Sequence, residues 1–257
     1  MMNFFFSIQA EDIISKLQIP KFSNKLEKSN NKINLYSLTI KNNTWNVELT
    51  NCNQDNDFYY LCEKNLGNEK IFFLSKEKEI EKLEEKNYLE LLNIDNFTET
   101  NPAYRANLEI YNLGGGFSSY QSEYPFAMTT KQGGILSPLS TLLNVEADKN
   151  FIFFKNIYFQ PVQKKFSYYI VDIHKKKLLK SGYVITNNTN VIEIDKKYIA
   201  QSIFFLTKDF IGIPIFSSIK ENHISLEHTH PPHHYLWGKD KFKKIKELKE
   251  KCYEIIN

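Results

Sequence analysis

The histidines of this sequence are concentrated in one short segment. Five of the six fall within twelve residues: His223, His228, His230, His233 and His234. If residues 223–230 form a strand, alternation places His228 and His230 on one face together with Ile224 and Leu226. Two imidazoles two residues apart on one face can ligate a common ion, and neutral imidazole suits Zn, Fe, Cu or Ni. The segment therefore predicts a metal site at a strand end.

The residues around this pair offer further ligands. Pro231 and Pro232 end the strand and force a turn that can return His233 or His234 toward the pair, and Glu227 is another candidate. We expect a divalent transition metal, Zn or Fe, acting as a Lewis acid or activating water. In the alternative interpretation, the histidines are structural and bond to carbonyl groups or to a buried acid. The His-Thr-His element resembles the start of the cupin metal motif, but the Glu that continues it is absent, so the chain is not assigned to that family.

Glycines mark a second segment of interest. Five of only nine glycines lie between positions 114 and 134, which indicates backbone with positive φ or close approach. Between them stand Tyr120, Glu123 and Tyr124, polar and aromatic groups of the kind that recognise a small polar ligand or a sugar. We expect this loop to lie against the histidine turn and form a cleft with it. The alternative is a long, well-packed loop without a ligand.

Arg105 is the only arginine among 33 basic residues. A position that retains arginine where lysine fills every other basic site indicates a need for a planar, bidentate donor. Either a partly buried acid or a carboxylate or phosphate on a ligand would meet that need. Arg105 is therefore a candidate substrate-binding residue with Tyr120, Glu123 and Tyr124, whereas no motif identifies a catalytic residue.

Composition excludes several classes of protein. The 257 residues are 42% hydrophobic and 14% aromatic, enough for a packed core, and no apolar run approaches the roughly 20 residues of a membrane helix. Residues 239–254 hold seven Lys and four acids, so they account for the whole net charge of +3 and leave no basic surface for nucleic acid. Three cysteines without CxxC spacing favour a reducing, cytoplasmic compartment. The abundance of Lys and Asn is typical of an AT-rich genome.

Short runs rich in Val, Ile, Phe and Tyr predict a mainly β fold, an antiparallel β-sandwich or barrel with peripheral helices. A hairpin is expected over residues 34–50, with strands at 57–62 and 70–75. Eight more are expected at 107–111, 151–159, 167–173, 178–185, 191–194, 203–207, 213–217 and 223–230. Helices are expected over 11–17 and after Ser75, the first within a peripheral arm of 33 residues. The spacing of Phe242, Ile245, Leu248 and Cys252 predicts a C-terminal amphipathic helix.

These elements suggest one compact unit in three parts: an N-terminal α+β region (1–100), a β-rich core carrying the site (101–238) and the C-terminal helix (239–257). The leading hypothesis is a metal-dependent enzyme that acts on a small polar or sugar-like substrate through the histidine cluster. The alternative is a non-catalytic β-sandwich module for binding or assembly, with a small polar or carbohydrate ligand and structural histidines.

Overall fold

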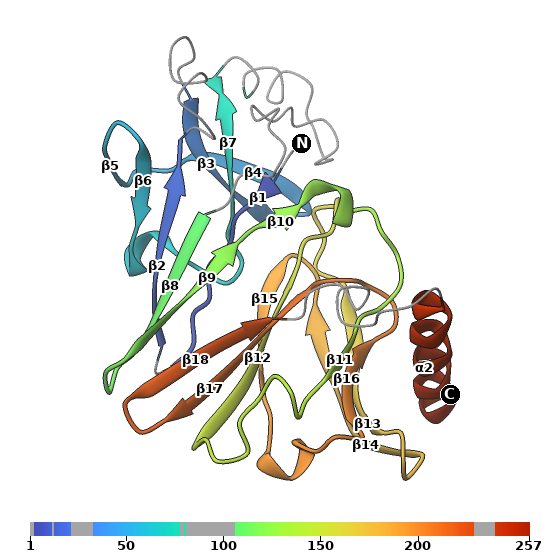
Figure 1. Ribbon diagram of the computed structural model, residues 1–257. Helices are drawn as coiled ribbons and strands as arrows, with labels where there is room; N and C mark the ends of the chain where they lie inside the picture. Colours follow the sequence, from blue (N-terminus) through green and yellow to red (C-terminus); the bar gives the residue numbers. More distant parts are fainter. Residues whose placement is uncertain (1–2, 12, 22–32, 78–79, 81–105, 229–239) are drawn as a thin grey trace.

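The computed structural model describes residues 3–11, 13–21, 33–77, 80, 106–228 and 240–257 (Figure 1). This part of the chain is mainly β, with antiparallel strand pairs and a helix at the C-terminus. The predicted fold class, a β-sandwich type with a peripheral C-terminal helix, is thereby confirmed. No helix in the described ranges is long and apolar enough to cross a membrane.

The first strands form two sheets, which we call sheets I and II. Sheet I has the order β5 (Asn53–Gln54), β6 (Phe58–Leu61), β2 (Ile13–Pro20), β8 (Ala106–Asn112) and β9 (Phe117–Ser122). Sheet II has the order β4 (Thr44–Leu49), β3 (Ile33–Lys41) and β7 (Ile71–Lys76). A separate pair joins β1 (Asn3–Phe4) to β10 (Tyr124–Pro125). The pairing of β3 with β4 confirms the hairpin predicted over 34–50.

The later strands form sheets III and IV. Sheet III has the order β15 (Asn188–Glu193), β12 (Lys149–Asn156), β17 (Ile213–Lys220) and β18 (His223–His228). Sheet IV has the order β11 (Leu136–Pro138), β16 (Ile203–Thr207), β13 (Lys165–Asp172) and β14 (Lys177–Ile185). Short 3-10 turns are η2 (Glu63–Asn65), η4 (Phe126–Met128) and η5 (Lys196–Tyr198). Each strand predicted between 107 and 228 coincides with one of these or with β8, within a few residues at its ends.

The N-terminal segment corrects two predictions. Residues 11–17, expected as a helix, belong largely to strand β2, and Ile13, Leu17 and Ile19 point alternately into the core. Nor is the start of the chain a peripheral arm, because Phe4, Phe5 and Phe6 are fully or almost fully buried. β2 pairs with a strand on each side, and this pairing outweighs the helical preference of the local sequence. Most of the helix expected after Ser75 lies outside the described residues.

Sheet III is the central layer of the molecule, because both of its faces are buried. One face contributes Phe153, Ile215 and Ile224 to a core shared with the inner sides of sheets I and II. The other contributes Phe154 and Phe216 to a second core against sheet IV. Strands covered on both sides read as continuous apolar runs. This is the pattern of β12 and β17.

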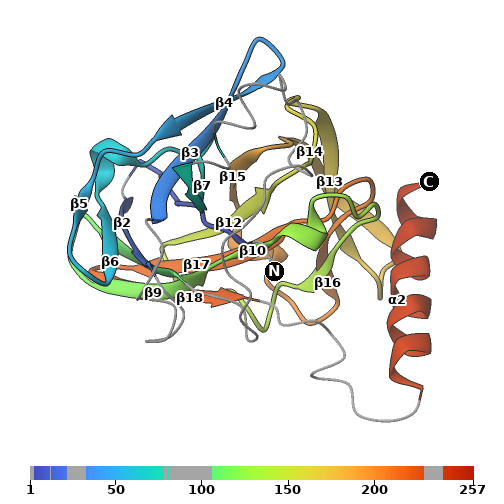
Figure 2. The same cartoon turned by 90° about the horizontal axis from the view of Figure 1, so that it is seen from above.

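Helix α2 (Lys241–Ile256) packs on the side of sheet IV that faces away from sheet III (Figure 2). Its buried residue Cys252 contacts a small cluster with Val171 and Leu206, and burial raises the pKa of the Cys252 thiol to about 11. The amphipathic C-terminal helix expected from the sequence is thus confirmed. Cys52 and Cys62, like Cys252, are free thiols.

The sheets do not divide at residue 100, where the sequence placed the end of the N-terminal region. Strands β8 and β9 come after that position, yet they complete sheet I by pairing along β2. Sheet I is therefore assembled from both sides of the segment 81–105, which is outside the described residues. The face of sheet I and the face of sheet III then share one core.

A loop at residues 67–70 connects the N-terminal segment to sheet III. Asn68 exchanges two hydrogen bonds of 2.8 Å with the backbone of Gln9, and Ser7 bonds to the carbonyl of Gly67 at 3.1 Å. From sheet III, the Thr189 amide donates to the Asn68 carbonyl (2.8 Å) and its hydroxyl to the Ser7 carbonyl (2.9 Å). The loop is therefore held by backbone groups from both sides.

Lys155 on β12 completes this junction from inside the core. Its side chain has no solvent-exposed surface, and its Nζ donates to the carbonyl oxygens of Asn68 (3.1 Å) and Lys70 (3.3 Å) beside the Phe6 ring. Burial lowers the pKa of Lys155 to about 7, and the carboxylate of Glu69 opposes that shift. A buried amine is thus the central donor of the junction.

The pKa of Lys155 predicts how stability depends on pH. Because the folded pKa of about 7 lies below the ordinary 10.5, the folded state binds fewer protons than the unfolded state between these values. Stability therefore rises across this window and falls as the pH returns to 7. Urea unfolding at about pH 7 and about pH 10 should show a rise roughly 3 kcal/mol larger for wild type than for Lys155→Met. The exposed variant Lys177→Met should keep the wild-type dependence, and equal slopes for wild type and Lys155→Met would contradict the assignment.

Candidate functional site

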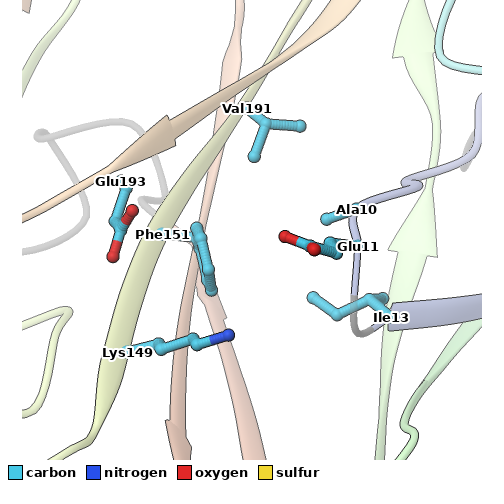
Figure 3. A pocket seen from close by; sticks show the side chains of 7 residues that line it. All are labelled: Ala10, Glu11, Ile13, Lys149, Phe151, Val191 and Glu193. Carbon is cyan, nitrogen blue, oxygen red and sulfur yellow. The ribbon is translucent and has the colours of Figure 1, made fainter.

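A groove opens at one end of the shared core, between the N-terminal segment and sheet III (Figure 3). Its volume is about 380 Å³, and seven residues line it: Ala10, Glu11, Ile13, Lys149, Phe151, Val191 and Glu193. Ala10, Glu11 and Ile13 form one wall, where the Ile13 amide donates to the Ala10 carbonyl at 3.1 Å as the chain turns into β2. Strands β12 and β15 form the other wall.

Strand geometry explains why the sheet III residues share this groove. Phe151 and Glu193 are register partners on β12 and β15, and Lys149 lies two residues before Phe151 on the same face. Phe151 is half-buried and stacks on Phe153, with ring centroids 5.8 Å apart, so its ring is anchored to the core. Figure 3 shows the Glu11 carboxylate and the Lys149 amino group directed into the space beside the Phe151 ring, with Glu193 on the ring's other side.

A second hollow of about 410 Å³ adjoins the first, because both are lined by Lys149 and Glu193. Its other lining residues are Asp148, Asn150, Lys180, Ile194, Asp195 and Lys196. The charges here are largely used within the fold. The Asp195 carboxylate accepts from the Lys197 amide and lies 2.7 Å from the Lys197 amino group, which lowers the pKa of Asp195. The first hollow, with its anchored ring, is the better candidate for ligand binding.

The structure brings together two of the residues selected from the sequence. The Tyr120 ring on β9 meets the His228 ring on β18 edge to face, with centroids 5.1 Å apart. Both residues are half-buried. Tyr120 is the register partner of Leu108 and His228 that of Ile215, so both side chains lie on the core-facing sides of their sheets. They close the rim of the shared core where the edges of sheets I and III meet.

The other selected residues lie apart from this pair or outside the described ranges. Tyr124 is fully buried where β10 pairs with β1, and burial strongly raises its pKa, so it belongs to the core. Glu123, just before β10, has a buried Oε2 atom. Glu227 is exposed on the opposite side of β18 from His228. The segments holding Arg105, His230, His233 and His234 are not described, and the described residues contain no group of three or more His, Cys, Asp or Glu placed to hold a metal.

The glycine cluster has a structural explanation. Gly115 and Gly116 have φ of +117° and +75°, and a Cβ on Gly116 would collide with the backbone carbonyl of Asn222 in the turn between β17 and β18. The Asn112 side chain also donates to the Glu221 carbonyl at 3.0 Å. The two hairpin ends therefore dock closely and align β9 with β18. This confirms the expectation of positive φ and close approach.

The groove residues Glu11, Lys149, Phe151 and Glu193 were not selected from the sequence. Glu11 fell within the expected helix. The apolar run that contains Phe151 predicts a strand, but it does not indicate which of its residues are exposed at the end of that strand. Glu11 and Glu193 are separated by most of the chain, so only the packing of sheet III against the N-terminal segment brings them to one groove.

The chain matches no family model, no curated protein and no solved structure. A function must therefore be argued from the site alone.

Replacing Gly116 tests the docking of the two hairpins. Gly116→Ala combines a positive φ with a backbone collision and should lower the free energy of unfolding by about 3 kcal/mol. Gly133 also has a positive φ, +110°, but no atom lies within 4 Å of an added Cβ. Gly133→Ala is therefore the matched control and should cost about 1–2 kcal/mol. Equal losses in urea denaturation would show that the close approach contributes nothing.

Proposed function

We propose that this protein is a non-catalytic binding module that holds a small polar, sugar-like ligand in the groove between Ala10, Glu11 and Ile13 and the ends of β12 and β15. The observation that carries the proposal is the anchored Phe151 ring flanked by Glu11, Lys149 and Glu193. An apolar ring face can contact the C–H side of a sugar ring, while a few polar groups around it fix its orientation. Carboxylates accept hydrogen bonds from hydroxyl groups and Lys149 can donate one.

The exposure of the groove supports binding rather than chemistry. Glu11, Lys149 and Glu193 are all exposed residues. Catalysis by such groups gains most where water is excluded and electrostatic interactions are strong. A ligand that binds and leaves reversibly needs no such enclosure.

The charge of the groove favours a cationic substituent on the ligand. The lining contains two carboxylates, on Glu11 and Glu193, and one ammonium, on Lys149, so it carries one net negative charge. A ligand that combines a hydroxylated ring with an amino group complements both the Phe151 face and this charge. The chemical class that fits is an amino sugar.

Glucosamine is the probe for this proposal, with glucose as its uncharged counterpart. For a ligand of this size, about 0.3 kcal/mol per atom corresponds to a Kd in the millimolar range, which isothermal titration or saturation-transfer NMR can measure. We expect wild type to bind glucosamine more tightly than glucose. Phe151→Ala should abolish binding of both, and Glu193→Gln should weaken glucosamine about threefold while leaving glucose unchanged.

The matched control is Tyr183→Ala, which removes an exposed aromatic ring on β14 of sheet IV, a strand that lines neither the groove nor sheet I. It should leave both affinities unchanged. Because Phe151 also packs on Phe153, the melting temperature of Phe151→Ala should be recorded, and Glu193→Gln serves as the variant that leaves the packing intact. If wild type binds no glucosamine even at ligand concentrations well above millimolar, the proposal is overturned.

A second candidate function is metal-dependent catalysis through the histidine cluster. The position of His228 supports this candidate. His228 is half-buried at the end of β18, next to Tyr120 and immediately before the rest of the cluster. We propose for this candidate that His228 and His230, with one of His233, His234 or Glu227, hold Zn or Fe. The metal would then act on a small polar substrate.

Elemental analysis of protein purified without a histidine tag tests this second candidate. Near-stoichiometric Zn or Fe is expected in wild type, with a sharp fall in His228→Ala. His223→Ala is the matched control, because His223 is exposed on the opposite face of the same strand. Folded protein that takes up neither metal on incubation, or a loss that is the same in both variants, would remove the candidate.

A further inference from the structure

The outer face of sheet I presents an ordered grid of side chains. Inner positions of β2 and β8 are buried, so the alternate residues on these strands point away from the core. Their register defines three rows across the sheet: Tyr60, Gln18, Asn107 and Gln121; Lys16, Glu109 and Ser119; Ile14, Tyr111 and Phe117. None of these residues is buried. The grid is thus an accessible face of mixed polar and aromatic character.

The polar part of the grid is built from amide and carboxylate groups held in place by their neighbours. The Asn107 amide donates to Glu109 Oε1 at 3.2 Å, and the Tyr111 hydroxyl donates to Glu109 Oε2 at 2.6 Å. Amides carry two N–H donors and an acceptor, and a carboxylate offers several acceptor positions. Such groups can exchange hydrogen bonds with hydroxyl groups, which both donate and accept.

Aromatic rings border the polar groups at opposite corners. Phe117 is 64% exposed and stacks with Tyr111, with centroids 5.7 Å apart. At the other corner Tyr60 is 38% exposed and donates its hydroxyl hydrogen to Asp55 at 2.8 Å, which raises the pKa of Tyr60. Both borders therefore offer ring surface to a ligand that crosses the strands.

The charges on the face balance. Lys16 and Glu109 are register partners, and the Lys16 Nζ lies 4.6 Å from the centroid of the Tyr111 ring. Beside Tyr60, hydrogen bonds from Tyr60, Asp57 and Phe58 lower the pKa of the Asp55 carboxylate. The nearby amino group of Lys21 lowers it further, by a smaller amount. Among the grid residues themselves, Lys16 and Glu109 are the two charged side chains and they cancel, which an uncharged ligand complements.

The dimensions argue against a stable protein partner. Three strand spacings of about 4.8 Å and four residues of about 3.4 Å give the grid a flat footprint of about 14 Å by 14 Å, or roughly 200 Å². A stable protein interface buries about 800 Å² on each partner and has an apolar centre, whereas the centre of this grid is polar. A narrow, hydroxyl-rich chain fits the area better than a second folded surface.

We propose that the outer face of sheet I binds a neutral glycan chain, with Tyr60 and Phe117 contacting sugar rings at the two ends and the amide and carboxylate groups bonding hydroxyls between them. This surface is distinct from the groove, which is lined by the inward-facing side of the β2 start. The two proposals stand independently.

Isothermal titration of the full-length protein with cellohexaose and maltohexaose, two neutral hexasaccharides, tests the platform. Wild type is expected to bind at least one of them. Phe117→Ala should weaken that binding about fivefold, since one aromatic contact of this kind is lost. The matched control is Tyr183→Ala on β14 of sheet IV, because Tyr183 is 65% exposed and lies on another sheet. It should leave the affinity unchanged.

The possible outcomes distinguish glycan binding on sheet I from ligand binding in the groove and from self-association of the protein. Phe151→Ala should not alter hexasaccharide binding, and Phe117→Ala should not alter glucosamine binding. Failure of wild type to bind either hexasaccharide, or equal weakening by Phe117→Ala and Tyr183→Ala, overturns the proposal. A concentration-dependent dimer in light scattering that Phe117→Ala abolishes, without hexasaccharide binding, assigns the face to a second copy of the chain instead.

Discussion

The buried amino group of Lys155 joins sheet III to the loop at 67–70, which holds the N-terminal segment. An amine inside an apolar core is tolerated only where acceptors surround it, so the loop at 67–70 must direct two carbonyls toward one point. Once that loop is fixed, Asn68 positions the N-terminal segment at Gln9, and Thr189 ties the same loop to β15. The relation between the N-terminal segment and sheet III thus rests on one donor and the backbone around it, and the groove lies between these same two parts.

The double burial of sheet III determines where a ligand can reach it. Phe153 and Phe154 point to opposite cores, and between them they leave no free face in the middle of β12. At its start the strand passes beyond the cover of the N-terminal sheets, and there Lys149 is exposed and Phe151 half-exposed. Within the part of the chain that the structure describes, the outer positions of β2, β8 and β9 are not buried, so the outer face of sheet I offers the other accessible array of ordered side chains. Candidate binding surfaces occur where the layers end.

The sequence was sufficient for the strands after residue 106, because each has a compact run of β-forming residues between polar turns. It failed at β2, where Ile13, Ile14 and Leu17 have helix-like spacing and the inward-facing Ser15 interrupts the apolar alternation. Ser15 is accepted in the core because its hydroxyl donates to the Ile8 carbonyl, a partner that local sequence does not reveal. Unusual local composition was enough to select Tyr120 and His228 as candidate site residues. The residues of the groove could not be selected in this way, because Glu11 and Glu193 come together only through long-range packing.

The shared core also has a consequence for synthesis of the chain on the ribosome. Phe4, Phe5 and Phe6 are synthesised before the residues that complete their core, since Phe153, Ile215 and Ile224 follow more than 140 residues later. The core around the N-terminal strands therefore cannot be completed until the strands of sheet III have been made. Contacts of such high sequence separation form slowly, and transiently exposed strands are prone to aggregate. A nascent chain of this design depends on protection, by a chaperone or by the ribosome surface, for longer than one in which the first strands close a core of their own.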